Sequence, residues 1–481
     1  MYKFKTKPYK HQLELFELTK DKEYWGIFAE MGCGKSKIFL DTAGYLYTEG
    51  KIQGCLILAP KGVYHNWSNN EIPIHLPDEI LDNTDMLVWS TSKTKKYEVE
   101  KKAFIAKNGR FKILVANIET FVSKTSEKAI SNFLKRFKSI VCVDESTYIK
   151  SPKADRSKII VKLCELAPYR RILTGSPSPQ GPTDLFMQCR ALHKDALGFK
   201  TYTAFKVHYC KLMMRDVGTH SFQQIVGYRN LEDLNYRLSK FTSRVTKASC
   251  LDLPDKVYQY REVELTTEQK RLYKEIKEFS RTQLLESKDI ITAEHVLTKL
   301  IRLHQITCGF YQADDSEKVV PIPGANPRLN ELKEILLATT DKVIIWATYR
   351  YNIAQIEAMV KENFGEDSYV TCHGGTEKKA RSIVSNVFQE NEDVRFFIGN
   401  RAGAYGLTLT KSATTVYYSN DYNLEVRLQS EDRNHRISQT RKVTYIDLIC
   451  RKTVDEKIIK ALRAKKNIAD IITGDEWREW L

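Results

Sequence analysis

The sequence contains no uninterrupted apolar run of about 18 residues, so a transmembrane helix is not expected. Its first twenty residues lack the apolar core of a secretory signal peptide. The ten cysteines are scattered and none forms a C-x-x-C pair, so a zinc site is not expected. Several of them lie within apolar runs, where cysteine behaves as a small hydrophobe. These absences favour a protein of the reducing cytoplasm.

Positive charge is what the chain has in excess. Its 76 Lys and Arg residues outnumber 60 Asp and Glu residues, which gives a net charge of +16. Such an excess favours a polyanionic partner through phosphate contacts and counterion release. Many soluble proteins are basic without binding nucleic acid, so charge alone leaves both interpretations open. The length of 481 residues predicts two or three domains.

Short apolar runs alternate with helical patterns along both halves, which predicts an α/β fold of mostly parallel sheets with helices on both faces. Residues 187–242 and 262–325 have helical spacing instead, so we expect a helical protrusion on each half. Residues 319–327 contain three prolines and a glycine and predict a loop. The expected strands lie at 55–59, 112–116, 140–143, 171–173, 343–347, 368–372, 395–398, 414–418 and 443–449.

A phosphate-binding loop is predicted at 24–36, YWGIFAEMGCGKS, because an apolar stretch runs through glycines into a helical pattern. The glycines let backbone N–H groups curl around phosphate oxygens, and the helix N-terminus adds a positive dipole end. Lys35 would reach the β- and γ-phosphates of ATP, and Ser36 would ligate Mg²⁺. The strict pattern needs glycine where Ala29 stands, so a chance glycine-rich turn is the alternative. The expected contacts are Met31, Gly32, Cys33, Gly34, Lys35 and Ser36.

Two adjacent carboxylates follow the apolar run 140–143 and are predicted to lie at the carboxyl end of a buried strand. Asp144 would hold Mg²⁺, and Glu145 would orient and polarise the attacking water. A pair of acids after a strand is more often a turn than a catalytic pair, but the preceding phosphate loop favours catalysis.

Residues 425–447 supply a third element. Gln429, Arg433 and Arg436 are spaced four and then three apart, so on a helix they share one face. One amide and two permanently charged guanidiniums suit a polyphosphate. The alternative is that these residues only form a solvent-exposed face of a helix and bind no ligand.

Taken together, these segments resemble the motifs of superfamily-two nucleic-acid motors, specifically the Swi/Snf family of double-stranded DNA translocases. The similarity covers almost the whole chain in order. The segments are 7–12 (adenine-reading), 29–36 (motif I), 56–67 (Ia), 144–158 (II), 173–186 (III), 243–273 (family connector), 342–356 (IV), 373–389, 400–423 (V) and 429–458 (VI).

The resemblance implies two RecA-like lobes, 1–245 and 246–481, that bind ATP between them and ratchet along DNA. It implies that Gln12 reads adenine, that Gly406 contacts the nucleotide, and that Arg433 and Arg436 stabilise charge on the transferred phosphoryl group. The residues that match the family's DNA-contacting motifs are Lys61, Asn117, Thr348, Arg350, Arg401 and Thr408.

Two positions depart from the family's pattern. Motif II reads DEST, where the family usually has alanine or glycine and then histidine. That histidine helps to couple the ATP site to motif III, so Thr147 puts coupling in question more than hydrolysis. Ala29 replaces a frequent acidic residue, which we expect to be tolerated.

We therefore expect a DNA-dependent ATPase that moves on double-stranded DNA and remodels branched DNA or displaces bound protein. It would act as a monomer in a bacterial or phage-infected cytoplasm, with a replication or recombination protein as a possible partner. One alternative is a strand-separating DNA or RNA helicase. No sequence element marks a separating pin, although 91–110 or 211–230 could contain one. Another is an ATP-switched DNA clamp or a subunit of a defence complex. The terminal DEWREWL (475–481) either packs on the second lobe or docks a partner.

Overall fold

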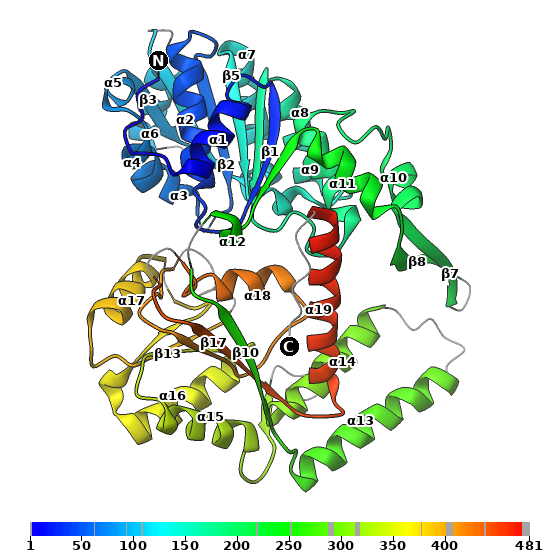
Figure 1. Cartoon of the computed structure of the whole chain (residues 1–481). Coiled ribbons are helices and arrows are strands. Elements are labelled where there is room, and N and C mark those ends of the chain that lie inside the picture. Colours follow the sequence, from blue (N-terminus) through cyan, green and yellow to red (C-terminus); the bar gives the residue numbers. More distant parts are fainter. Residues whose placement is uncertain are drawn as a thin grey trace. The chain divides into compact units, whose positions relative to one another are not determined.

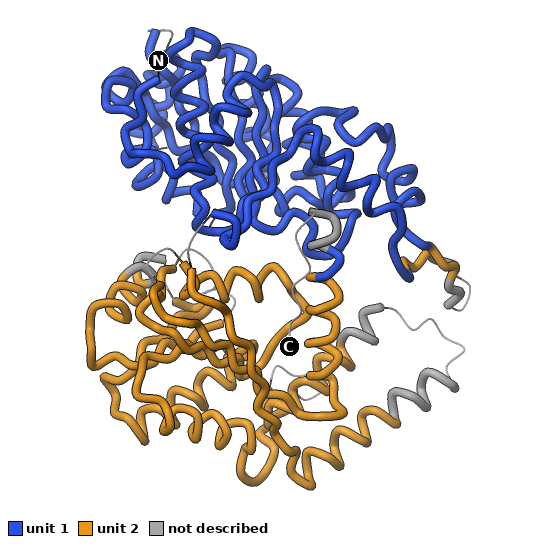
Figure 2. Tube along the Cα trace, viewed as in Figure 1, with its two compact units in different colours: residues 1–211, 226–252, 467–477 blue, residues 212–225, 253–466, 478–481 orange. Residues whose placement is uncertain are grey.

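The chain divides into two compact units (Figure 2). Unit 1 contains Met1–Lys211, Val226–Asp252 and Asn467–Trp477, and unit 2 contains Leu212–Ile225, Leu253–Lys466 and Arg478–Leu481. The main boundary thus lies after residue 252, whereas we expected it after residue 245. The computed structural model describes residues 2–61, 63–92, 94–106, 109–217, 220–250, 253–286, 293–312, 318–376, 378–400, 407–436 and 439–473.

A seven-stranded parallel sheet forms the centre of unit 1, with the strand order β3-β4-β2-β5-β6-β1-β9 (Figure 1). All four strands that we expected in this half are present. The apolar stretch before the glycines forms β1, while β3 and β9 were not predicted. The strands are β1 (Tyr24–Ala29), β2 (Gly54–Ala59), β3 (Thr84–Val88), β4 (Phe111–Asn117), β5 (Ser139–Asp144), β6 (Tyr169–Thr174) and β9 (Thr242–Val245).

Helices cover both faces of this sheet, as parallel strands require. In α7, for example, Ile130, Phe133 and Leu134 form the buried face, and the last turn is basic. The helical elements are α1 (Lys10–Thr19), α2 (Lys35–Thr48), α3 (Tyr64–Asn66), η1 (Trp67–Glu71), α4 (Ile72–His75), α5 (Asp78–Leu81), α6 (Lys95–Phe104), η2 (Ile118–Val122), α7 (Lys124–Arg136), η3 (Ser146–Ile149), α8 (Asp155–Glu165), η4 (Pro182–Asp184), α9 (Leu185–Leu192), α10 (Tyr202–Tyr209), α11 (Leu231–Ser239) and α12 (Lys247–Cys250).

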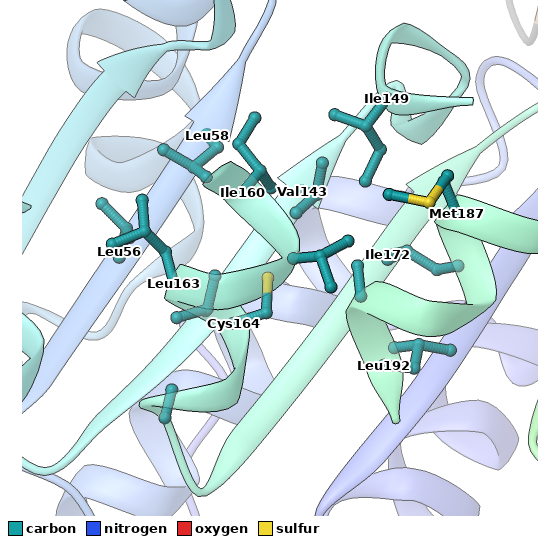
Figure 3. Packing of buried hydrophobic residues seen from close by; sticks show 14 of the residues in the cluster. Leu56, Leu58, Val143, Ile149, Ile160, Leu163, Cys164, Ile172, Met187 and Leu192 are labelled. Atoms are coloured by element: carbon teal, nitrogen blue, oxygen red, sulfur yellow. The ribbon is translucent and has the colours of Figure 1, made fainter. Parts of the chain in front are cut away.

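The core of unit 1 consists of two apolar layers, one on each face of the sheet. Leu56 and Leu58 of β2 point into one layer, whereas Cys55 and Ile57 point into the other, because side chains alternate along a strand. Figure 3 shows the first layer, in which Leu58 and Val143 of the sheet meet Ile160 of α8. Every residue of β2 is buried, as in a central strand covered on both faces.

The expected helical protrusion at 187–242 needs correction over part of its length. It contains α10 and α11, but β7 (Cys210–Val217) and β8 (His220–Tyr228) between them form a two-stranded sheet. The sequence of β8, HSFQQIVGY, is rich in aromatic and β-branched residues, which favours strand over helix.

Unit 2 contains a six-stranded parallel sheet with the order β10-β17-β16-β13-β15-β14. The five strands expected in this half are present, and β10, at one edge, was not predicted. Figure 1 shows α15 and α16 beside this sheet, where Leu332 and Ile356 pack on Ile345. The strands are β10 (Lys256–Glu262), β13 (Val343–Trp346), β14 (Tyr369–Cys372), β15 (Phe396–Gly399), β16 (Thr414–Tyr417) and β17 (Val443–Ile449).

The segment 262–325 of unit 2 contains the expected helices, but the predicted loop at 319–327 begins with a strand, β12 (Val319–Pro321), which pairs antiparallel with β11 (Phe310–Gln312).

No helix within the described part of the chain is long and apolar enough to cross a membrane. The helical elements are α13 (Thr267–Glu286), α14 (Ala293–Thr307), α15 (Pro327–Ala338), α16 (Arg350–Phe364), η5 (Glu366–Ser368), α17 (Lys378–Glu390), α18 (Leu424–Glu431) and α19 (Val454–Thr473).

Polar groups at the start of α19 are buried and bonded to one another. Asp455 pairs with Arg328 and accepts a hydrogen bond from Thr307 Oγ1 at 3.1 Å. His304 Nδ1 lies 2.8 Å from the hydroxyl of Tyr349. Burial lowers the pKa of His304 to about 4, although the charge of Asp455 opposes the shift.

This histidine makes stability depend on pH. An unfolded histidine, with a pKa of about 6.5, takes up a proton that the folded state excludes. We therefore expect the free energy of unfolding to fall by about 2 kcal/mol between pH 7 and pH 5 through this group. Urea denaturation of wild type and His304→Gln at both pH values measures the difference. The exposed residue His65 supplies a control, His65→Gln, and an unchanged pH slope in His304→Gln would contradict the assignment.

Candidate active site

Three loops meet at the carboxyl edge of the sheet in unit 1 because β5, β6 and β1 are consecutive neighbours. The loop after β1 carries the glycines, the one after β5 carries DEST, and the one after β6 carries motif III. Gly175 lies against the glycine loop, since a Cβ built on it would be 3.6 Å from Ala29 O and from Met31 N. The strand order thus brings together segments more than 100 residues apart in the sequence.

The glycine loop ends at Gly34, which caps the N-terminus of α2 in a left-handed conformation with φ of 81°. A Cβ there would lie 2.1 Å from Gln12 Nε2, so both the backbone and the space require glycine. Lys35 and Ser36 are the first two residues of α2. This places both at a helix N-terminus, which favours an anion.

Gln12 of α1 is buried against this loop, and its adenine-reading role stays a prediction. Its Nε2 lies 3.4 Å from Cys33 O, and its Oε1 accepts a hydrogen bond from Tyr9 N. His11 Nε2 lies 2.9 Å from the same Cys33 oxygen. The first helix is therefore attached to the loop by two side chains.

Asp144 ends β5, and N–H groups donate to both of its oxygens. Trp67 Nε1 donates to Oδ2 at 2.9 Å, and Glu145 N donates to Oδ1 at 3.0 Å. Burial raises the pKa of the Asp144 carboxyl, while the Trp67 bond and the charge of Lys35 act to lower it. Lys35 Nζ itself donates to Ala29 O at 2.8 Å. The predicted lysine thus lies close enough to the predicted aspartate for its charge to act on that carboxyl group.

Glu145 adopts a left-handed backbone with φ of 46° and ψ of 58°. For a residue other than glycine this conformation costs about 1 to 3 kcal/mol and persists where the surroundings enforce it. Thr174 Oγ1 of motif III donates to Glu145 Oε2 at 3.3 Å. The carboxylate that we assigned to water activation is therefore attached to motif III through a hydroxyl.

Three contributors to this edge were not predicted as site residues: Trp67, Thr174 and Arg244. Trp67 stood out only as the end of motif Ia, and its partner is 77 residues away. Arg244 Nη1 donates to Phe28 O at 3.2 Å and to Gly175 O at 3.0 Å. It therefore ties the connector segment to the ends of β1 and β6.

The connector also contacts the glycine loop directly. Lys247 N donates to Glu30 Oε2 at 2.9 Å, and Cys250 Sγ lies 3.6 Å from Cys33 Sγ. Glu30 lies next to Ala29, where the family often has an acid. The carboxylate here serves to hold residues 244–250 on the loop.

In unit 2, the shared helix face expected for motif VI needs correction. Helix α18 ends at Glu431, so Arg433 and Arg436 lie in the turns that follow it. Arg433 is buried and donates through Nε to Gln429 O at 2.8 Å and through Nη1 to Leu407 O at 3.0 Å. Arg436 is only partly buried and donates to Thr408 Oγ1 at 2.8 Å. Both arginines therefore contact motif V.

A buried charge network fixes α18. Arg427 pairs with Glu431 through Nε at 2.8 Å and with Asp447 of β17 through Nη1 at 2.5 Å. Glu431 also accepts hydrogen bonds from Lys256 and Tyr258 of β10. Buried charges need such pairing, so the ion pairs with β10 and β17 fix the position of α18, the helix that precedes Arg433 and Arg436.

The predicted DNA contacts are distributed over both units. Lys61 is exposed and Asn117 ends β4 in unit 1. In unit 2, Arg350 begins α16 with its Nη2 beside Gly375, and Thr348 N donates to Ser419 Oγ. Arg401, Gly406 and the terminal segment 475–481 lie outside the described residues.

The model of the SNF2-related domain matches residues 12–311, and that of the helicase conserved C-terminal domain matches residues 327–438. The chain belongs to the SNF2-related family.

Curated relatives of this SNF2-related chain include human "DNA annealing helicase and endonuclease ZRANB3", which is 27% identical over 91% of the chain and 38% of the relative. The "putative ATP-dependent helicase/translocase YwqA" of Bacillus subtilis is 25% identical over 70% of the chain and 36% of the relative. The chain thus spans well under half the length of these relatives.

Among solved structures, the Sulfolobus solfataricus SWI2/SNF2 ATPase core in complex with dsDNA is 22% identical. The match covers 98% of this chain and 94% of that one, with a TM-score of 0.43.

The donor set of the SNF2-related site fits Mg²⁺ bound with a nucleotide. Mg²⁺ prefers oxygen ligands and is held in such sites by one or two carboxylates together with substrate phosphates. Asp144 would supply the carboxylate and Ser36 the hydroxyl. The bonds to Trp67 and Glu145 use one lone pair on each Asp144 oxygen and orient the group.

Trp67→Phe should weaken metal use, because Asp144 Oδ2 loses its indole donor in a buried position. We expect kcat/KM for MgATP to fall about 10- to 100-fold, as for outer-shell partners of metal ligands. The acidic limb of the pH profile should shift upward because the charged carboxylate is less stabilised. ATPase assays over Mg²⁺ concentration and pH measure both effects. Trp89, whose Nε1 donates to Ser126 Oγ, supplies the matched control Trp89→Phe, and equal losses in both variants would contradict the prediction.

Substitution of the two arginines should have different effects: one should lower stability and the other should lower the rate of ATP turnover. Arg433→Ala removes two buried hydrogen bonds, to Gln429 O and to Leu407 O, and should lower the free energy of unfolding by about 2 kcal/mol or more. Arg436→Ala should keep stability and lose roughly 10³- to 10⁵-fold in kcat. Thermal unfolding and ATPase assays measure these effects, with Arg441→Ala as a control in an exposed pair with Asp341. Near-full turnover in Arg436→Ala would overturn the role of motif VI.

Proposed function

We propose that this SNF2-related chain is a DNA-dependent ATPase that moves on double-stranded DNA. The observation that carries the proposal is the meeting of the glycine loop, Lys35 and the Asp144 carboxylate at one sheet edge. The net charge of +16 supports a nucleic-acid partner.

In this proposal each residue at the edge has one task. Gln12 recognises adenine, while the N–H groups of 31–34 and the start of α2 hold the phosphates. Mg²⁺ would neutralise charge on the transferred phosphoryl group. Glu145 orients the attacking water, and the hydroxyl of Thr174 keeps that carboxylate in place. The action of Arg433 and Arg436 on the same nucleotide stays a prediction.

We further propose that the motor remodels branched DNA or displaces bound protein. The name of the human relative, a DNA annealing helicase, and that of the bacterial relative, a helicase/translocase, support this choice. Action as a monomer in a bacterial or phage-infected cytoplasm, with a replication or recombination partner, belongs to the same proposal.

A strand-separating helicase is the second candidate, and β7 and β8 favour it. These strands form a two-stranded sheet over residues 210–228, which covers most of 211–230, one of the two segments that could contain a separating pin. Met213 and Met214 of β7 are 46% and 57% exposed, so apolar side chains are available to stack on a base pair. Unwinding of forked DNA would favour this candidate.

Steady-state ATP hydrolysis distinguishes the candidates. We expect little turnover alone, strong stimulation by linear duplex DNA and more by a four-way junction. Stimulation by single-stranded DNA or RNA alone would favour the strand-separating helicase. No hydrolysis under any condition would overturn the proposal and favour an ATP-switched clamp.

Lys35→Ala should abolish hydrolysis, because the phosphates lose their cation, while DNA binding survives. Lys274→Ala is the matched control, since the side chain of Lys274 is 74% exposed on α13. DNA affinity of wild type and of Lys35→Ala should be measured over a range of salt concentrations. Plots of the logarithm of the binding constant against the logarithm of the salt concentration should have the same slope, because the number of phosphate contacts with DNA is unchanged.

A further inference from the structure

Gln188 is a buried amide in an apolar helix. It lies in α9 with no exposed surface, between Met187 and Cys189, which are also buried. Figure 3 shows Met187 of α9 beside Ile149 and Ile172, in the apolar layer on the sheet. A polar side chain in such a place is retained at a cost unless it is hydrogen-bonded.

The amide of Gln188 is bonded at both ends. Its Oε1 accepts a hydrogen bond from Ser146 Oγ at 2.7 Å. Its Nε2 donates to Pro177 O and to Asp184 O, each at 2.7 Å. One side chain therefore joins the segment after Glu145 to the segment after Thr174.

These bonds close a circuit around Glu145. On one side, Ser146 directly follows Glu145, whose left-handed backbone needs support from its neighbours. On the other side, Thr174 Oγ1 donates to Glu145 Oε2 at 3.3 Å and accepts from Ser176 N at 3.2 Å. Gln188 holds the next residue, Pro177, and so contacts both branches that fix the carboxylate.

We propose that Gln188 is a positioning residue for ATP hydrolysis, which acts through Ser146 and motif III to hold Glu145 for the attacking water. The inference rests on the proposed function. It assigns coupling between motifs II and III to a hydroxyl–amide pair in a chain where Thr147 occupies the position of the family's histidine.

A positioning role predicts a loss in kcat without a loss in nucleotide binding. In Gln188→Met the shape of the side chain is kept and all three bonds are lost. We expect the duplex-stimulated kcat to fall about 10- to 100-fold, as when a catalytic group is displaced by about 1 Å. The KM for ATP should stay within about twofold, because the loop contacts at 31–36 are unchanged.

Ser146→Ala removes the hydrogen bond between Ser146 and Gln188 by deleting its donor. If the two residues act through one bond, the double variant should be no slower than Gln188→Met, and the losses should not add. Ser146→Thr keeps the hydroxyl and should retain more activity than Ser146→Ala. Met187→Ala is the matched control, since it weakens the same helix without removing a polar bond and should keep kcat well below its melting temperature.

The outcomes separate this inference from the proposed function. If wild type hydrolyses no ATP with any nucleic acid, the proposed function fails and the inference fails with it. If wild type is active and Gln188→Met keeps its kcat, or changes only the KM for ATP, the inference alone is overturned. A loss in Met187→Ala equal to that in Gln188→Met would show a purely structural role and would overturn it as well.

Discussion

The order of three parallel strands is the constraint on which the active site depends. Because β5, β6 and β1 are neighbours in one sheet, their carboxyl ends present motifs II, III and I side by side. Each strand is buried on both faces, so its register is fixed by the apolar layers above and below. Catalytic geometry is therefore determined by core packing, and the loops need only short polar contacts to finish it.

These polar contacts are buried, so each hydrogen bond contributes more to the geometry of the site than it would at the surface. Asp144 is buried between Trp67 and the backbone of Glu145, and Gln188 is buried among apolar side chains. In such surroundings an unpaired polar group is costly, and both Asp144 and Gln188 are hydrogen-bonded at each polar atom of the side chain. The same logic holds in unit 2, where Arg427, Glu431 and Asp447 fix the start of motif VI.

The sequence was sufficient where the signal is local. The central strands are continuous apolar runs, and the glycine loop has its own pattern, so both were predicted. The pairs Trp67–Asp144 and Ser146–Gln188 were not, because their members are 77 and 42 residues apart and no spacing rule connects them. The helical spacing of Gln429 and Arg433 also gave a wrong prediction at motif VI. It predicted one helix through both residues, whereas α18 ends at Glu431. The edge strand β10 is only partly buried and carries no continuous apolar run.

Under the proposed role of Gln188, the DEST motif meets a constraint of the family by different chemistry. A histidine in this position would bond motif III through a ring that titrates near neutral pH. The groups that join the motifs here are the hydroxyls of Ser146 and Thr174 and the amide of Gln188, none of which titrates in that range. The bond between Ser146 and Gln188 therefore has no charge to lose between pH 5 and pH 8. Its strength depends instead on exclusion of water, so the apolar layer around α9 is as much a part of the coupling as the bonds themselves.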